Sequence, residues 1–72
     1  MLSPTKNLVS GTVTAWTRRH FGFIAVDGNP DELFLHLTDC PNREPLTVNT
    51  RVRFQIVTYG ARLKAANVEV IQ

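Results

Sequence analysis

Short runs in which hydrophobic and polar residues alternate fill most of the chain, and turn-forming residues close each run. A period of two places successive side chains on opposite faces of a β-strand. No run shows a 3.6-residue period over the length of a helix. The pattern therefore predicts five short strands, over residues 11–16, 21–26, 32–37, 51–57 and 63–71.

The connections between the runs differ in kind. Residues 27–31 (Asp-Gly-Asn-Pro-Asp) form a dense turn cluster, which predicts a hairpin between the second and third strands. Residues 38–49 contain two prolines, which predicts a loop with room for a short helical turn. Residues 1–8 read as a short flexible polar tail, so the predicted domain covers residues 9–72.

The chain of 72 residues is long enough for one small core. Five short strands favour a closed or nearly closed antiparallel barrel, because closure removes the exposed edges of a sheet. The predicted fold class is therefore all-β. The side chains expected to fill the barrel are mostly aliphatic: Val13, Ala15, Ile24, Val26, Leu33, Leu35, Val52, Phe54, Ile56, Val68 and Val70.

The second and third runs are apolar on both faces, which is more than one small barrel can bury. If the aliphatic faces point inward, Phe21, Phe23, Phe34 and His36 point outward, with Trp16 alongside on the first strand. A chain this short has no second layer to cover them. The pattern thus predicts an exposed aromatic patch, which usually marks a binding surface. The alternative is an inverted barrel, with these phenylalanines inside and the leucines outside.

Flat rings next to basic side chains suit unpaired nucleobases, because every base offers a π-face for stacking. Eight basic and six acidic residues give a net charge of only +2, so the positions of the basic residues decide this interpretation. Arg18, Arg19 and His20 flank the aromatic patch on one loop, and Arg62 and Lys64 lie near the last loop. Together with Arg43 in the long loop, these side chains are the candidates for phosphate contacts.

Other chemistries find little support in the sequence. The single Cys40 cannot form an internal disulfide, and one cysteine with two histidines forms no metal cluster at ordinary spacing. No phosphate-cradling glycine loop or nucleophile elbow is present. No apolar run approaches the roughly 18 residues of a membrane span, and the first residues lack a signal peptide's apolar core. We expect a non-catalytic cytoplasmic protein without metal or cofactor.

Four segments together form a specific signal. Residues 21–24 (Phe-Gly-Phe-Ile) and 33–37 (Leu-Phe-Leu-His-Leu) resemble the two RNA-binding motifs of the cold-shock domain. Residues 11–13 (Gly-Thr-Val) and 65–68 (Ala-Ala-Asn-Val) resemble the start and the end of the same family. The resemblance spans about residues 9–71. It implies an OB-fold barrel that binds single-stranded RNA or DNA, as an RNA chaperone or as a regulator of transcription or translation.

The chain also departs from the family pattern. Ala15-Trp16 stands where the family has adjacent tryptophan and phenylalanine, and the segment that follows is one residue shorter. The usual lysine-glycine before the first motif is reduced to His20, and Leu37 replaces an aromatic residue. The aromatic residue of the long loop is missing, with Arg43 nearby. Fewer stacking positions imply weaker or narrower binding than in a typical bacterial member.

The leading hypothesis is non-catalytic binding of single-stranded RNA or DNA by a monomer, with a short pyrimidine-rich strand as the expected ligand. The competing hypothesis is a protein-interaction or self-associating module that uses the same aromatic patch, and a small enzyme ranks last. The predicted nucleic-acid-binding residues are Trp16, Arg18, Arg19, His20, Phe21, Phe23, Phe34, His36, Arg62 and Lys64.

Overall fold

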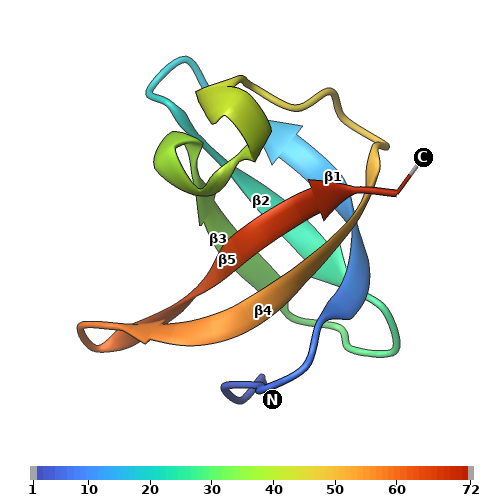
Figure 1. Cartoon of the computed structure of the whole chain (residues 1–72), viewed down its shortest axis with the longest axis vertical. Helices are drawn as coiled ribbons and strands as arrows, with labels where there is room; N and C mark the ends of the chain where they lie inside the picture. The colour runs from blue at the N-terminus through green and yellow to red at the C-terminus, as the bar shows by residue number, and fades with distance from the viewer. Residues whose placement is uncertain (1, 72) are drawn as a thin grey trace.

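Five strands close into a barrel in the order β1–β2–β3–β5–β4 in a computed structural model that describes residues 2–71 (Figure 1). The prediction of an all-β, five-stranded barrel is confirmed. Two short 3₁₀ turns, η1 (Leu37–Asp39) and η2 (Pro41–Arg43), lie in the predicted loop between the third and fourth strands. The strands are β1 (Val9–Trp16), β2 (Phe21–Val26), β3 (Glu32–His36), β4 (Arg51–Tyr59) and β5 (Arg62–Val70).

Four of the five strand pairs are antiparallel, and the fifth pair, β3–β5, is parallel. This parallel pair joins Phe34 to Lys64, and it closes the barrel. The predicted antiparallel arrangement thus holds for four pairs and not for β3–β5, because the alternation of residues does not reveal the direction of a strand. Within residues 2–71, no helix has the length and apolar character needed to cross a membrane.

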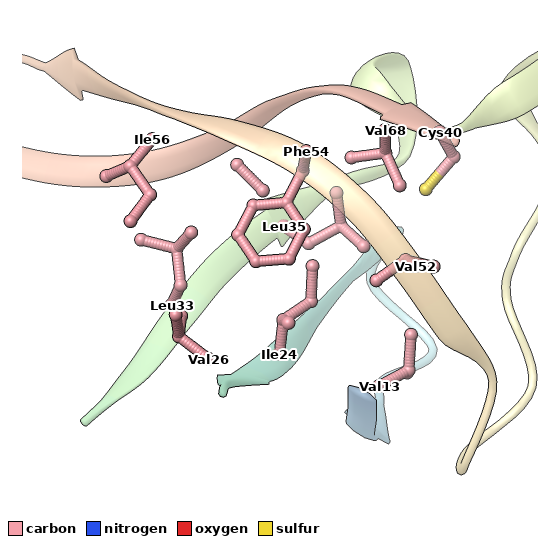
Figure 2. Packing of buried hydrophobic residues seen from close by; sticks show 11 residues of the cluster. Val13, Ile24, Val26, Leu33, Leu35, Cys40, Val52, Phe54, Ile56 and Val68 are labelled. Carbon is pink, nitrogen blue, oxygen red and sulfur yellow. The ribbon is translucent and has the colours of Figure 1, made fainter. Parts of the chain in front are cut away.

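Aliphatic side chains from all five strands surround Phe54, which is fully buried in the barrel (Figure 2). Ile24, Leu33 and Leu35 are at most 1% exposed, which rules out the inverted barrel. The buried cluster is Val13, Ile24, Val26, Leu33, Leu35, Cys40, Val52, Phe54, Ile56, Ala65 and Val68.

Two residues of the predicted core lie elsewhere. Val70, the last residue of β5, pairs with Val52 but is 46% exposed, because nothing in the described chain covers that end of the strand. Ala15 leaves the core because a β-bulge shifts the register of β1 between Val13 and Ala15. A bulge adds one residue to one strand and so reverses the alternation of faces beyond it. Ala15 consequently pairs with Phe23 on the outer face.

Residues 2–8 lie against the barrel next to β4. The Thr5 amide donates to the Ile56 carbonyl at 2.9 Å, and the Gln55 amide donates to the Lys6 carbonyl at 2.7 Å. Leu2 packs against the buried cluster. The chain therefore continues alongside β4 before β1 begins, and the flexibility expected of this segment stays a prediction.

Candidate nucleic-acid interface

Three phenylalanines and one histidine occupy neighbouring outward positions of β2 and β3. Phe21 pairs across the strands with His36, and Phe23 pairs with Phe34. All four side chains are half-buried, while the residues between them on both strands are buried. We call this set of four residues the aromatic platform. The predicted outward direction of its rings is confirmed.

The rings of the platform support one another at the distances of aromatic pairs. The Phe21 and Phe34 ring centroids lie 5.4 Å apart, and Phe23 meets Phe21 edge-on at 5.9 Å. The His36 ring lies 6.4 Å from that of Phe34. Such contacts hold each ring in place without burying it. The platform is thus a preformed surface of π-systems, half open to solvent.

Trp16 takes a different position from the one predicted. Beyond the bulge of β1 it pairs with Gly22, and its ring packs against the buried cluster. A Cβ atom on Gly22 would lie 2.5 Å from the Trp16 ring and 2.4 Å from the Ala15 carbonyl oxygen. The missing side chain of Gly22 therefore makes room for the tryptophan of the neighbouring strand. The predicted place of Trp16 beside the outward rings is wrong, and Ala15 lies there instead.

His36 is held by its own backbone. Its Nδ1 atom accepts a hydrogen bond from the Thr38 amide at 3.2 Å, in the role of a cap for η1. In a neutral imidazole with an accepting Nδ1, the proton lies on Nε2. No residue of the described chain accepts a hydrogen bond from that Nε2–H. The edge of the platform thus offers one ring donor next to Phe34.

The loop between β1 and β2 carries the basic residues Arg18, Arg19 and His20, all of them exposed. Neither arginine pairs with a carboxylate within residues 2–71. His20 adopts a positive φ of 69°, and its carbonyl accepts the Leu37 amide at 2.8 Å. This bond ties the basic loop to the end of β3, where His36 lies. The loop therefore borders the platform, as its place in the sequence predicted.

The two basic residues predicted on β5 have different surroundings. The Lys64 ammonium lies 2.9 Å from the Asp39 carboxylate, in an ion pair whose side chains are 22% and 19% exposed. It also lies 4.9 Å from the centroid of the Tyr59 ring. A phosphate would have to compete with Asp39 for this cation. Arg62 is exposed on the hairpin that extends from the barrel at the lower left of Figure 1.

Acidic residues gather at the opposite end of the platform from the basic loop. Glu32 begins β3 and pairs with Ala25, beyond Phe23 and Phe34. It accepts a hydrogen bond from the hydroxyl of Thr14, the bulge residue of β1. The platform consequently lies between a basic end and an acidic end. A polyanion is expected to approach it from the side of Arg18 and Arg19.

Cys40 lies in the core rather than at the surface. Its thiol is buried and weakly donates to the His36 carbonyl at 3.7 Å. Burial, and secondarily the negative charge of Asp39, raises the pKa of the thiol to about 11. The thiol is therefore protonated at neutral pH, which suits a small packing residue. No group of three metal-ligating side chains occurs within residues 2–71.

One residue beside this surface, Asp39, could not be identified from the sequence, whereas the exposed Tyr59 could already be interpreted there as an extension of the platform from its loop. Asp39 lies 25 residues from its partner Lys64, and no local pattern in the sequence predicts that pairing. Tyr59 has a local signal, since it is an aromatic residue directly before the turn at Gly60.

A closed five-stranded barrel with an outward aromatic surface is typical of a class of small binding domains. Residues 9–71 match the model of the 'Cold-shock' DNA-binding domain, and the chain belongs to this family. Members of the family bind single-stranded nucleic acids and are non-catalytic. The resemblance inferred from the four sequence segments is thereby confirmed.

Solved structures agree on the fold. Among 26 matching chains, that of drosophila Unr CSD456 superposes with a TM-score of 0.78 at 23% sequence identity. The match covers 90% of this chain and 27% of the Unr chain, so the present chain spans about a quarter of that structure. No curated protein sequence matches the chain.

Proposed function

We propose that this domain binds single-stranded RNA or DNA by stacking bases on the aromatic platform. The observation that carries the proposal is the half-exposure of three mutually supported phenyl rings on adjacent outward positions. Stacking contributes about 1–3 kcal/mol per base and tolerates any base. A short pyrimidine-rich strand is the proposed ligand.

The basic loop supplies the second component of binding. Arg18 and Arg19 have no carboxylate partner in the described chain and border the platform, so they are available to phosphates. His20 holds this loop against the end of β3 through its carbonyl. If about three to four phosphates are neutralised, log K falls with log salt at a slope of about −2 to −3.

The biological role we propose is that of an RNA chaperone, or a regulator of transcription or translation, acting as a monomer in the cytoplasm. With Ala15 in place of an outward aromatic residue, the platform offers few stacking positions. Weak, sequence-tolerant stacking releases strands quickly. Such binding opposes the re-formation of hairpins without trapping the RNA.

The decisive experiment is a titration of dye-labelled oligouridine and oligo-dT, followed by fluorescence anisotropy at two salt concentrations. Phe34→Ala is the test variant, and Val48→Ala, which removes an exposed apolar side chain outside the platform, is its control. We expect weaker binding only for Phe34→Ala. Absence of binding by the unmodified protein at tens of micromolar and low salt would refute the proposal. A dimer that ignores oligonucleotides would support the self-association hypothesis instead.

A further inference from the structure

Tyr59, at the end of β4, is the most exposed large hydrophobic side chain of the described residues, with 57% of its surface accessible. It does not belong to the core, and it makes no ring contact with the platform phenylalanines. Its ring instead interacts with the Lys64 ammonium, which lies 4.9 Å from the ring centroid. A single exposed aromatic side chain is ordinary on a protein surface, so the position of Tyr59 relative to the platform decides its interpretation.

The register of the strands connects Tyr59 to the platform. Phe34 pairs with Lys64 across β3 and β5, and Lys64 pairs with Val57 across β5 and β4. Tyr59 is two residues beyond Val57, so it shares the same outward face of β4. Two strand spacings, roughly 10 Å, separate β3 from β4. The outer surface thus continues from Phe34 over Lys64 to Tyr59.

Asp39 holds Lys64 in place between Phe34 and Tyr59. Its carboxylate holds the Lys64 ammonium at 2.9 Å, and both side chains are about four-fifths buried. The ammonium in turn lies against the Tyr59 ring, which limits the positions that the ring adopts. A ring oriented before binding loses less entropy when a base stacks on it. The ion pair therefore orients Tyr59, while its own charges largely cancel.

The hairpin also provides a cation for the backbone of a bound strand. Arg62 pairs with Tyr59 across the turn, is exposed, and has no carboxylate partner within residues 2–71. Gly60 opens the turn with a φ of 61°, a conformation that glycine adopts without strain. The tight turn places Tyr59 and Arg62 directly opposite each other across the two strands. This pairing of ring and cation is the combination that single-stranded nucleic acids require.

We propose that Tyr59 is an additional stacking position, occupied by a base of the same single strand that lies on the aromatic platform. Arg62 contacts the phosphate that accompanies this base, and the Asp39–Lys64 pair positions the tyrosine. This inference rests on the proposed function, because it places the additional base by extending the platform. It implies that strands long enough to pass Lys64 gain affinity that shorter strands lack.

The test compares oligouridines of about three and about eight nucleotides, the longer one within the site sizes of OB folds. Tyr59→Ala is expected to weaken binding of the longer strand about five-fold or more, and to leave the shorter strand unaffected. Tyr59→Phe retains the ring and serves as the matched control, with affinity close to that of the unmodified protein. Phe34→Ala weakens both strands.

The outcomes separate the two proposals. If Tyr59→Ala binds both lengths as tightly as the unmodified protein does, or loses affinity equally for both, the Tyr59 position is refuted and the platform stands. If the unmodified protein binds neither length, the proposed function itself fails.

A second measurement on the unmodified protein does not depend on the folding of a variant. Oligouridines of about eight nucleotides carry 5-iodouridine at one position at a time and are photocrosslinked to the protein. We expect the peptide that contains Tyr59 to crosslink when the label is near one end of the strand, and the platform peptides when it is further in. Crosslinks confined to the platform at every position would overturn the inference.

Discussion

The outer surface of the barrel has two regions that differ in their side chains. In both regions, alternate residues of each strand point outward. On the side of β4, charged groups are paired: Arg51 forms a bidentate pair with Asp27, and Arg53 pairs with Glu69 at 2.6 Å. On the side of β2 and β3, the outward positions carry the aromatic platform, which has no cover in the described chain. The core behind both regions is similarly aliphatic.

The difference shows where function resides in this fold. The barrel needs only one face of each strand, and the other face is left to solubility or to binding. On β4 the outward Arg51 and Arg53 complete their interactions within the chain, whereas the ring of Tyr59 at the end of the strand stays exposed. On β2 and β3 the outward positions leave half-exposed π-faces, next to the loop of Arg18 and Arg19, which have no carboxylate partner within residues 2–71. We therefore centre the proposed binding site on β2 and β3.

The largest effect should come from breaking the core that both regions share. Phe54 is fully buried, so Phe54→Ala removes a large ring from the centre of the barrel. Large-to-small changes of this kind cost about 3–5 kcal/mol, which a domain this small can hardly tolerate. Urea denaturation measures the loss, with Phe54→Leu as the milder control. A loss below that of Phe34→Ala would contradict the assignment of faces.

Removing one ring of the platform should separate binding from stability. Phe34→Ala is expected to cost about 1–3 kcal/mol of binding free energy, because one stacked base loses its partner. Its effect on the free energy of unfolding should be well below that of Phe54→Ala, since the Phe34 side chain is already partly in water. Anisotropy titrations and urea denaturation of the same sample test both statements. Equal losses of stability would show that the platform is core.

Charge changes should distinguish the two regions by their response to salt. The double variant Arg18→Gln with Arg19→Gln is expected to make the salt slope less steep by about 0.7 for each lost phosphate contact. Arg53→Gln removes a cation that Glu69 already neutralises, so its slope should stay unchanged. Titrations over a range of salt concentrations give both slopes. A flatter slope for Arg53→Gln would mean that the nucleic acid contacts Arg53 on β4, and would contradict binding at the platform.

The smallest effect concerns pH and the paired region alone. The hydrogen bond from Arg51, opposed by slight desolvation, lowers the pKa of Asp27 below its ordinary value. Because the folded-state pKa is below the unfolded one, the stabilisation is present above about pH 4 and is lost as pH falls through the folded value. Asp27→Asn should therefore reduce the acid dependence of the urea midpoint. An unchanged dependence would mean that the exposed pair contributes nothing measurable.

The alternation of the sequence was sufficient to predict the five strands, most of the core and the outward direction of Phe21, Phe23 and Phe34. It failed at Thr14, where a single extra residue in β1 moves Ala15 outward and turns Trp16 toward Gly22. A bulge depends on pairing with another strand, so a period of two cannot reveal it.

The interactions that define the β5 side of the surface were also out of reach of the sequence. Lys64 contacts Asp39 and Tyr59 only because β5 runs parallel to β3 and antiparallel to β4. The Asp39–Lys64 contact joins segments that lie 25 residues apart in the chain. The sequence identifies such residues as charged or aromatic. Their partners depend on which strands become neighbours when the barrel closes.

The packing of Trp16 over Gly22 gives the protein a built-in optical probe. The chain has a single tryptophan, so its ultraviolet emission comes from one indole that contacts the barrel interior. A change in that emission therefore indicates first a change in the pairing of β1 with β2. Intrinsic fluorescence is accordingly suited to following denaturation.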